Sequence, residues 1–241
     1  MQPQPLYKRI LLKLSGEALM GDESFGISPN IINQIVSEIK KILELKVQLA
    51  IVIGGGNIFR GISLGDQGMT RATGDYMGML ATVMNSLALE DAFNKNKIVT
   101  RVQSAVNINQ IVEPYVRAKS LQYLNENKVV IFSGGTGNPF FTTDTAAALR
   151  ASEIDADIMI KATKVDGIYT DDPVKNKNAT KIDRLNYDEA ITKNLKVMDA
   201  TAFTLCKEQN MPIGVINIFD KDSLYNFITS KESKSGTLVT R

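Results

Sequence analysis

The sequence contains no histidine, and this absence excludes several kinds of active site. Without histidine the chain cannot build a Ser-His-Asp triad, a Cys-His pair or a histidine-ligated metal site. Lysine, arginine, aspartate and threonine remain to carry any chemistry. Phosphoryl transfer suits this set, because it depends on positioning and charge neutralisation more than on a tuned general base.

Cysteine is almost as scarce, with Cys206 as the single residue of its type among 241. One cysteine cannot form a disulfide within the chain. The preceding residues, Ala202 to Leu205, fit a helical pattern. We therefore expect Cys206 to lie buried on a helix as a small apolar side chain.

Long apolar runs and excess charge are also missing. No stretch approaches the roughly 20 apolar residues that a transmembrane helix needs, and the polar start, Met1 to Pro5, lacks the apolar centre of a signal peptide. We expect a cytoplasmic protein that does not engage a membrane. The formal charge is +2 and the basic residues are scattered, which gives no reason to expect a nucleic-acid partner.

The order of the apolar segments indicates an α/β fold. The chain is 44% hydrophobic and 22% charged, as expected for an ordinary globular protein. Strand-like runs alternate with helical patterns, which predicts βαβ crossovers and a mostly parallel sheet covered on both faces. The runs lie at residues 8–14, 47–53, 98–102, 129–133, 157–162, 213–218 and 236–240.

Two further segments can be placed in this scheme. The clearest helix is predicted to begin at Ser28-Pro29, a capping residue followed by a proline at the first helical position. The polar stretch from Asp171 to Lys181 predicts an exposed loop that could separate a smaller C-terminal lobe. The apolar stripe of the helix comprises Ile31, Ile32, Ile35, Ile39, Ile42 and Leu43.

The segment from Ser133 to Asp144 is the strongest functional signal. An apolar strand leads into Gly134, Gly135 and Gly137, which permit close backbone approach and let successive N–H groups face an anion. The threonines and the alanine-rich run that follow predict a helix N-terminus beside the loop. The segment is equally readable as an ordinary strand-to-helix connection, so other loops must support a phosphate site.

A second glycine loop, Gly54 to Gly61, supplies that support. Three consecutive glycines follow an apolar strand, and close approach to a ligand explains them better than a structural role. Arg60 could offer its planar guanidinium to a phosphate.

A third loop follows the first strand, where Lys13 leads into Ser15 and Gly16. A lysine in such a strand is usually solvated, but the C-terminal ends of parallel strands are where ligands collect. Gly16 to Gly21 has the spacing of a Walker loop yet continues with Asp22, and the later glycine clusters lack the G-x-G-x-x-G pattern. Walker-type hydrolysis and dinucleotide binding are therefore disfavoured.

A fourth loop, from Lys161 to Pro173, combines an Asp-Gly turn, an aromatic side chain and clustered lysines that could clamp a nucleotide, although a plain surface loop explains it as well. Farther on, Asp199 precedes a helical segment, where aspartate is more often a cap than a catalyst.

Six motifs taken in order resemble those of the bacterial uridylate (UMP) kinases of the amino acid kinase superfamily, and the resemblance covers residues 6–240. They are Lys13–Leu19 (KLSGEAL), Gly54–Gly61 (GGGNIFRG), Gly74–Thr82 (GDYMGMLAT), Gly137–Asp144 (GNPFFTTD), Lys161–Gly167 (KATKVDG) and Leu195–Asp199 (LKVMD). Each motif is moderately specific, whereas all six in order are very specific.

The resemblance implies a single three-layer α/β/α domain over residues 1–241. Residues from about 6 to 155 would bind UMP and form oligomer contacts, and residues from about 156 to 241 would bind mainly ATP. The implied reaction is Mg-dependent transfer of the ATP γ-phosphoryl group to UMP, a step of pyrimidine nucleotide biosynthesis. The resemblance does not indicate which residues would hold the metal.

The resemblance also assigns residues. Lys13 would neutralise the transferring phosphoryl group, while Asp144 and Asp199 would orient lysines and the magnesium-bound nucleotide. The implied ATP contacts are Lys13, Leu14, Ser15, Gly16, Gly56, Arg60, Thr163, Tyr169 and Asp172. The implied UMP contacts are Gly55, Asp75, Thr136, Gly137, Asn138, Pro139, Phe140, Phe141, Thr142 and Thr143, with Asp75 accepting the ribose hydroxyls.

Family members are commonly hexameric, activated by GTP and inhibited by UTP. Arg101 and Lys128 stand where some GTP-activated members have basic residues. Glu90, however, stands where those members have an arginine, and a carboxylate there would repel a triphosphate. We expect a homohexamer, possible UTP inhibition and a weak or absent response to GTP.

Two other functions stay open at this point. One is a kinase of the same fold that phosphorylates a carboxylate or a carbamate. The other is a nucleotide sensor that binds without transferring phosphate, and such a sensor would have no need of Lys13 or Asp199.

Overall fold

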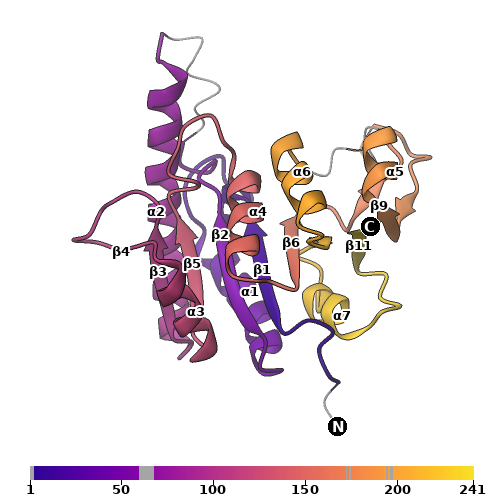
Figure 1. Cartoon of the computed structure of the whole chain (residues 1–241), viewed down its shortest axis with the longest axis horizontal. Helices are drawn as coiled ribbons and strands as arrows, with labels where there is room; N and C mark the ends of the chain where they lie inside the picture. The colour runs from indigo at the N-terminus through magenta and orange to yellow at the C-terminus, as the bar shows by residue number, and fades with distance from the viewer. Residues whose placement is uncertain (1–2, 60–67, 172, 174, 194, 196–197) are drawn as a thin grey trace.

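The computed structural model describes residues 3–59, 68–171, 173, 175–193, 195 and 198–241. A nine-stranded sheet forms the middle layer, in the order β4-β3-β5-β2-β1-β6-β10-β11-β9 (Figure 1). Neighbouring strands run parallel except β10 and β11. The strands are β1 (Arg9–Leu14), β2 (Gln48–Ile53), β3 (Thr100–Ser104), β4 (Glu113–Pro114), β5 (Val129–Ser133), β6 (Ile158–Thr163), β9 (Arg184–Asn186), β10 (Ile213–Asn217) and β11 (Gly236–Thr240).

Helices cover both faces of this sheet. They are η1 (Gly16–Leu19, a 3-10 helix), α1 (Pro29–Leu43), α2 (Arg71–Lys95), α3 (Arg117–Asn125), α4 (Thr143–Glu153), α5 (Tyr187–Thr192), α6 (Ala200–Glu208) and α7 (Ser223–Thr229). A separate antiparallel pair, β7 (Ile168–Tyr169) and β8 (Lys181–Ile182), flanks the segment 170–180. The α/β class and the mostly parallel sheet predicted from the sequence are confirmed.

Successive side chains of a strand point to opposite faces of the sheet, so alternate residues of the central strands belong to two separate hydrophobic cores. One core packs α1, α2 and α7 against Leu12, Leu14 and Ile51. The other packs α3, α4, α5 and α6 against Leu11 and Val52. The arrangement is therefore three layers, with the sheet between two helical layers.

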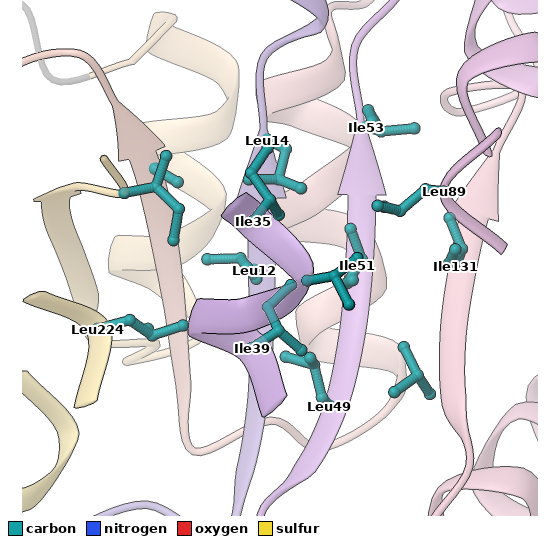
Figure 2. Packing of buried hydrophobic residues seen from close by; sticks show 14 of the residues in the cluster. Leu12, Leu14, Ile35, Ile39, Leu49, Ile51, Ile53, Leu89, Ile131 and Leu224 are labelled. Atoms are coloured by element: carbon teal, nitrogen blue, oxygen red, sulfur yellow. The ribbon is translucent and has the colours of Figure 1, made fainter. Parts of the chain in front are cut away.

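The packing of α1 is typical of the first core. Figure 2 shows Ile35 beside Leu14 of β1, and Ile39 near Leu12 of β1 and Ile51 of β2. Burying one such side chain contributes about 2 kcal/mol of transfer free energy. The helix starts at Pro29 as predicted, but the Ser28 side chain makes no capping hydrogen bond.

The seven predicted strands are all present within two residues of their expected bounds, and the short strands β4, β7, β8 and β9 are additional. Within the predicted stripe of α1, Ile31 and Leu43 are only partly buried, because they lie at its margins. Cys206 is fully buried on α6, as expected. No described helix is long and apolar enough to cross a membrane.

Candidate active site

Four adjacent parallel strands place the predicted loops at one edge of the sheet. In the sheet order, β5, β2, β1 and β6 are consecutive neighbours, and they end at Ser133, Ile53, Leu14 and Thr163. Carboxyl ends of parallel strands share one edge, so the loops that follow these four strands converge there. The structure thus brings together segments that lie up to about 150 residues apart in the sequence.

A buried cluster of two lysines and one carboxylate lies at this edge. Lys13 Nζ is 2.7 Å from Asp144 Oδ1, and Lys161 Nζ is 2.7 Å from Asp144 Oδ2. Lys13 and Lys161 are direct partners in the register of β1 and β6, so their side chains project from the same face of the sheet. Lys13 is only 7% exposed. Asp144 therefore holds two positive charges side by side where water has little access.

Asp144 is ionised in this setting. Burial acts to raise the pKa of its carboxyl group, but Lys13 and Lys161 oppose burial and together hold the pKa below its ordinary value. Lys161 was quoted in a sequence motif but not among the expected site residues. Its position opposite Lys13 follows from the strand register, which the structure provides and the local sequence does not.

Asp199 connects the starts of two helices. It is the N-cap of α6, where Oδ1 accepts a 3.0 Å hydrogen bond from the backbone N–H of Ala202. The Thr145 hydroxyl donates to the same oxygen at 3.1 Å, and the Thr142 hydroxyl donates to Oδ2. The described partners of Asp199 are thus helix-start groups, and they fix α4 and α6 relative to each other.

The loop between β5 and α4 carries most of the residues predicted for UMP. Gly134, Gly135 and Gly137 all have left-handed backbone angles, with φ between 59° and 83°. A side chain on Gly134 or Gly137 would also approach residues 104–106 to about 3.0 Å. Thr142 then caps α4 by accepting hydrogen bonds from the N–H groups of Asp144 and Thr145, as the sequence predicted.

Asp75 on α2 is tied to the same loop. Its Oδ2 accepts a 2.7 Å hydrogen bond from the backbone N–H of Phe140, which itself has φ of 73°. Arg71 Nε lies 3.6 Å from this carboxylate, and its guanidinium lies over the Phe140 ring. A non-glycine residue in the left-handed region is strained, and such strain is common at ligand sites.

The described residues predicted for ATP lie at or after the carboxyl ends of β1, β2 and β6. The Ser15 hydroxyl accepts a hydrogen bond from Ala18 N–H and so caps η1. The Thr163 hydroxyl donates to Val165 O at 2.6 Å, and Tyr169 donates to Asp166 Oδ1 at 2.7 Å, a bond that raises the pKa of Tyr169. Arg60 and Asp172 lie outside the described residues.

Gly54, Gly55 and Gly56 of the second glycine loop do not all face open space. A methyl group on Gly54 would lie 2.8 Å from Gly16 N, and one on Gly55 would lie 2.7 Å from Gly78 O of α2. Backbone-to-backbone packing within the protein therefore explains Gly54 and Gly55, whereas the sequence had favoured close approach to a ligand. A methyl on Gly56 would meet only the Glu17 side chain, at 3.6 Å.

Alanine at Gly55 and at Gly56 should therefore have different effects. Gly55→Ala is expected to lower the free energy of unfolding by about 2 kcal/mol, because α2 must move away from the loop. Gly56→Ala should leave stability within about 0.5 kcal/mol of the unmodified protein and instead raise the KM for ATP. Urea unfolding and steady-state kinetics of both variants test this, and equal destabilisation by the two would contradict it.

A cavity of about 700 Å³ adjoins the loop that follows β5. Thr136, Asn138 and Phe141 line it from the loop, and Thr145 and Leu149 line it from α4. The opposite side is lined from α6 by Ala200, Thr201, Thr204, Leu205 and Glu208. Its walls are mostly apolar with a few hydroxyl and amide groups, which is typical of a site for a flat organic ligand.

Arg101 and Lys128 are remote from the converging loops. Lys128 directly precedes β5, so it lies at the opposite edge of the sheet from the residues that follow Ser133. Both cations lie over the Tyr123 ring, and Lys128 pairs with Glu126 at 2.5 Å. Burial raises the pKa of Glu90, while the nearby Arg101 acts to lower it.

Comparisons with known proteins agree with this architecture. The model of the Amino acid kinase family matches residues 8–217. The UMP kinase from Bacillus anthracis superposes with a TM-score of 0.93 at 36% identity, covering 97% of this chain and 96% of that one. The UMP kinase from Ureaplasma parvum is 39% identical with a TM-score of 0.88, and each chain is fully covered. The uridylate kinase from Archaeoglobus fulgidus is 26% identical, with a TM-score of 0.71 over 96% of this chain and 99% of that one.

Proposed function

The chain belongs to the amino acid kinase family, and from that premise we propose that it is a UMP kinase, which transfers the γ-phosphoryl group of ATP to UMP and yields UDP and ADP. One observation supports phosphoryl transfer most directly: the carboxylate of Asp144 holds Lys13 and Lys161 at the edge where the four loops converge. This positive centre would stabilise the negatively charged phosphates of ATP and UMP when they are bound close together. The full-length likeness to two UMP kinases supports UMP as the acceptor.

The two nucleotides would divide the loops between them. We assign ATP to Lys13 through Gly16, Gly56, Arg60, Thr163, Tyr169 and Asp172, and UMP to Gly55, Asp75 and Thr136 through Thr143. The cavity beside Thr136 and Asn138 supports a nucleoside on that side of the site. Asp75 is proposed to hold the ribose with the carboxylate oxygen that does not receive the Phe140 N–H.

The chemistry needs no general base, because the acceptor phosphate is already an anion at neutral pH. In-line attack by a UMP phosphate oxygen on the γ-phosphorus would form the new P–O bond as the bond to ADP breaks, and ADP leaves with the electron pair. Lys13 would neutralise the transferring group, and backbone N–H groups would hold the flanking phosphates.

Magnesium is proposed to enter with ATP. The described residues contain no group of three or more His, Cys, Asp or Glu side chains that could hold a metal ion, and each carboxylate oxygen of Asp144 lies 2.7 Å from a lysine Nζ. Mg²⁺ commonly binds through substrate phosphates and water, so such a site is compatible with the residues present. The ion would neutralise phosphate charge, while Asp144 and Asp199 would act indirectly by fixing the lysines and the threonine hydroxyls.

Self-association is also proposed, with a homohexamer as the expected assembly. Tyr76, Met77, Leu80 and Met84 are between 38% and 54% exposed on α2. Their spacing places them on one face of the helix, and exposed apolar patches of this kind commonly mark contacts between proteins.

Regulation by nucleotides is proposed in a limited form. UTP inhibition is compatible with product-like binding at the UMP loops. GTP activation is expected to be weak or absent, because Glu90 lies near Arg101, which acts to lower the pKa of Glu90, and the Glu90 carboxylate would repel a triphosphate there. The protein is proposed to act in the cytoplasm.

A substrate panel tests the function directly. The purified protein would be incubated with ATP, Mg²⁺ and one of UMP, CMP, dTMP or N-acetylglutamate, and ADP release would be measured. We expect turnover with UMP alone. Turnover only with the amino acid would indicate a carboxylate kinase of the same fold, and nucleotide binding without ADP release would indicate a sensor.

A further inference from the structure

Helix α2 carries polar side chains on a face that is buried in the protein. Thr82 is 2% exposed, and Asn85 and Ser86 are fully buried, although Val83, Leu89 and Phe93 of the same helix belong to an apolar core. A buried hydroxyl or amide is costly unless it is hydrogen-bonded. The partners of these groups therefore indicate what the polar face does.

Thr82 binds the first residue of the loop that follows β5. Its Oγ1 accepts a 2.7 Å hydrogen bond from Gly134 N–H, while its own proton goes to Met79 O at 2.6 Å. On the other side of the same peptide group, Ser133 O accepts a 3.0 Å hydrogen bond from Ala105 N–H. A trans peptide is planar and its C=O and N–H point in opposite directions, so this peptide is anchored at both ends and cannot rotate.

Asn85 binds the first residue of the other glycine loop. Its Nδ2 donates to Gly54 O at 2.7 Å and to Asn57 Oδ1 at 2.7 Å, and its Oδ1 accepts from Asn57 Nδ2 at 2.9 Å. Because the Gly54 carbonyl is directed toward Asn85, the N–H of Gly55 in the same peptide points away from it. The amide of Asn57 extends the network to Gly26 O at 2.9 Å.

Together with Asp75, these side chains make α2 a common support for both loops. Asp75 holds Phe140 near the end of one loop, Thr82 holds Gly134 at its start, and Asn85 holds Gly54 in the other loop. All three lie on one continuous helix, residues 71–95. A shift of either loop relative to the other would break at least one of these hydrogen bonds, of which those of Thr82 and Asn85 are buried.

We propose that Thr82 and Asn85 are positioning residues, which fix the backbone N–H groups of the two glycine loops relative to each other and so align acceptor and donor phosphates. The inference rests on the proposed UMP kinase function. Valine would fill the Thr82 site as well if only packing mattered. The Thr82 hydroxyl and the Asn85 amide are needed for this role because each makes a hydrogen bond to the backbone of a glycine loop.

Steady-state kinetics of Thr82→Val, with UMP and ATP varied separately, test the proposal. We expect kcat/KM for UMP to fall about tenfold or more, because near-attack geometry is sensitive to shifts of about 1 Å. The KM for ATP should stay within about twofold, since Gly134 begins the loop assigned to UMP. Thr82→Ser keeps the hydroxyl and should restore kcat/KM for UMP.

Ser86→Ala is the matched control. Ser86 is buried one turn along the same helix, but its hydroxyl donates its hydrogen bond to Thr82 O within the helix. This variant should keep normal kinetics even if its melting temperature falls. Asn85→Asp replaces the amide donor with an oxygen at nearly constant size. It tests the other loop and keeps the proposal testable if Thr82→Val folds poorly. We expect the kcat of Asn85→Asp to fall about tenfold or more.

The outcomes are distinct. Equal kinetic effects of Thr82→Val and Ser86→Ala, or failure of Thr82→Ser to restore activity, would overturn the inference and leave a structural role. Normal kcat for Asn85→Asp would overturn it for the second loop. An unmodified protein without UMP turnover would overturn the proposed function itself, and this inference with it.

Discussion

Replacing Lys13 with alanine is expected to lower kcat for UDP formation by about a hundredfold to a thousandfold, the usual effect of removing one preorganised charge stabiliser. Lys13 is 7% exposed and its ammonium group is fixed 2.7 Å from Asp144, so it needs no reorganisation as charge develops on the transferring group. The KM for UMP and the KM for ATP should change much less, because other loops hold the ground-state nucleotides.

The Lys13→Ala variant should fold. Asp144 retains Lys161 at 2.7 Å, so no buried carboxylate is left unpaired. Lys8→Ala is the matched control, because Lys8 is exposed and lies just before the opposite end of β1. ADP release with UMP varied from below to above KM separates the two parameters. A raised KM at unchanged kcat would mean that Lys13 provides uniform binding rather than transition-state stabilisation.

The long strands and the sheet edge where their loops converge could be predicted from the sequence for a physical reason. Runs such as Leu49–Ile53 and Val129–Phe132 are buried on both faces, so they appear as continuous apolar segments. Strands of two or three residues, such as β4 and β9, carry too few side chains to show any period. Their pairing depends on neighbours brought close by the fold.

The side-chain partners at the site were less predictable, because they depend on register and helix rotation. Lys161 and Lys13 both pair with Asp144 because β1 lies beside β6, and no local sequence pattern reveals this pairing of strands. Thr82 and Asn85 are missed for a similar reason. Apolar residues are spread almost evenly around α2, so the sequence pattern does not distinguish its buried polar face from a solvent-exposed one. All the nucleotide contacts stay predictions, and Arg60 and Asp172 also lie outside the described residues.

Asp144→Asn is expected to impair stability and activity together. The amide keeps the size of the side chain but removes the negative charge between the two lysines, so Lys13 loses its ion pair in a buried site and Lys161 loses its ion pair with Asp144. Breaking a buried pair in this way costs about 3 kcal/mol in free energy of unfolding at pH 7. We expect kcat to fall about a hundredfold as well, because the two ammonium groups repel and lose their fixed positions.

The loss of stability should depend on pH in a defined direction. The pKa of Asp144 lies below its ordinary value of 3.8 in the folded protein, so its stabilising contribution is complete above that value and is lost as the pH falls through the folded pKa. The unmodified protein should therefore lose more stability than Asp144→Asn between pH 7 and about pH 3. Urea unfolding at several pH values measures this difference.

Asp155→Asn shows whether the effect belongs to the buried site. Asp155 pairs with Arg117 at 2.8 Å, but its side chain is 69% exposed, and such surface pairs contribute about 1 kcal/mol or less. Asparagine also tolerates the left-handed backbone of this position, where φ is 53°. Its acid profile should therefore follow that of the unmodified protein. If Asp144→Asn shows the same profile, the carboxylate does not hold the two lysines by its charge, and the positive centre at the sheet edge must be maintained by other groups.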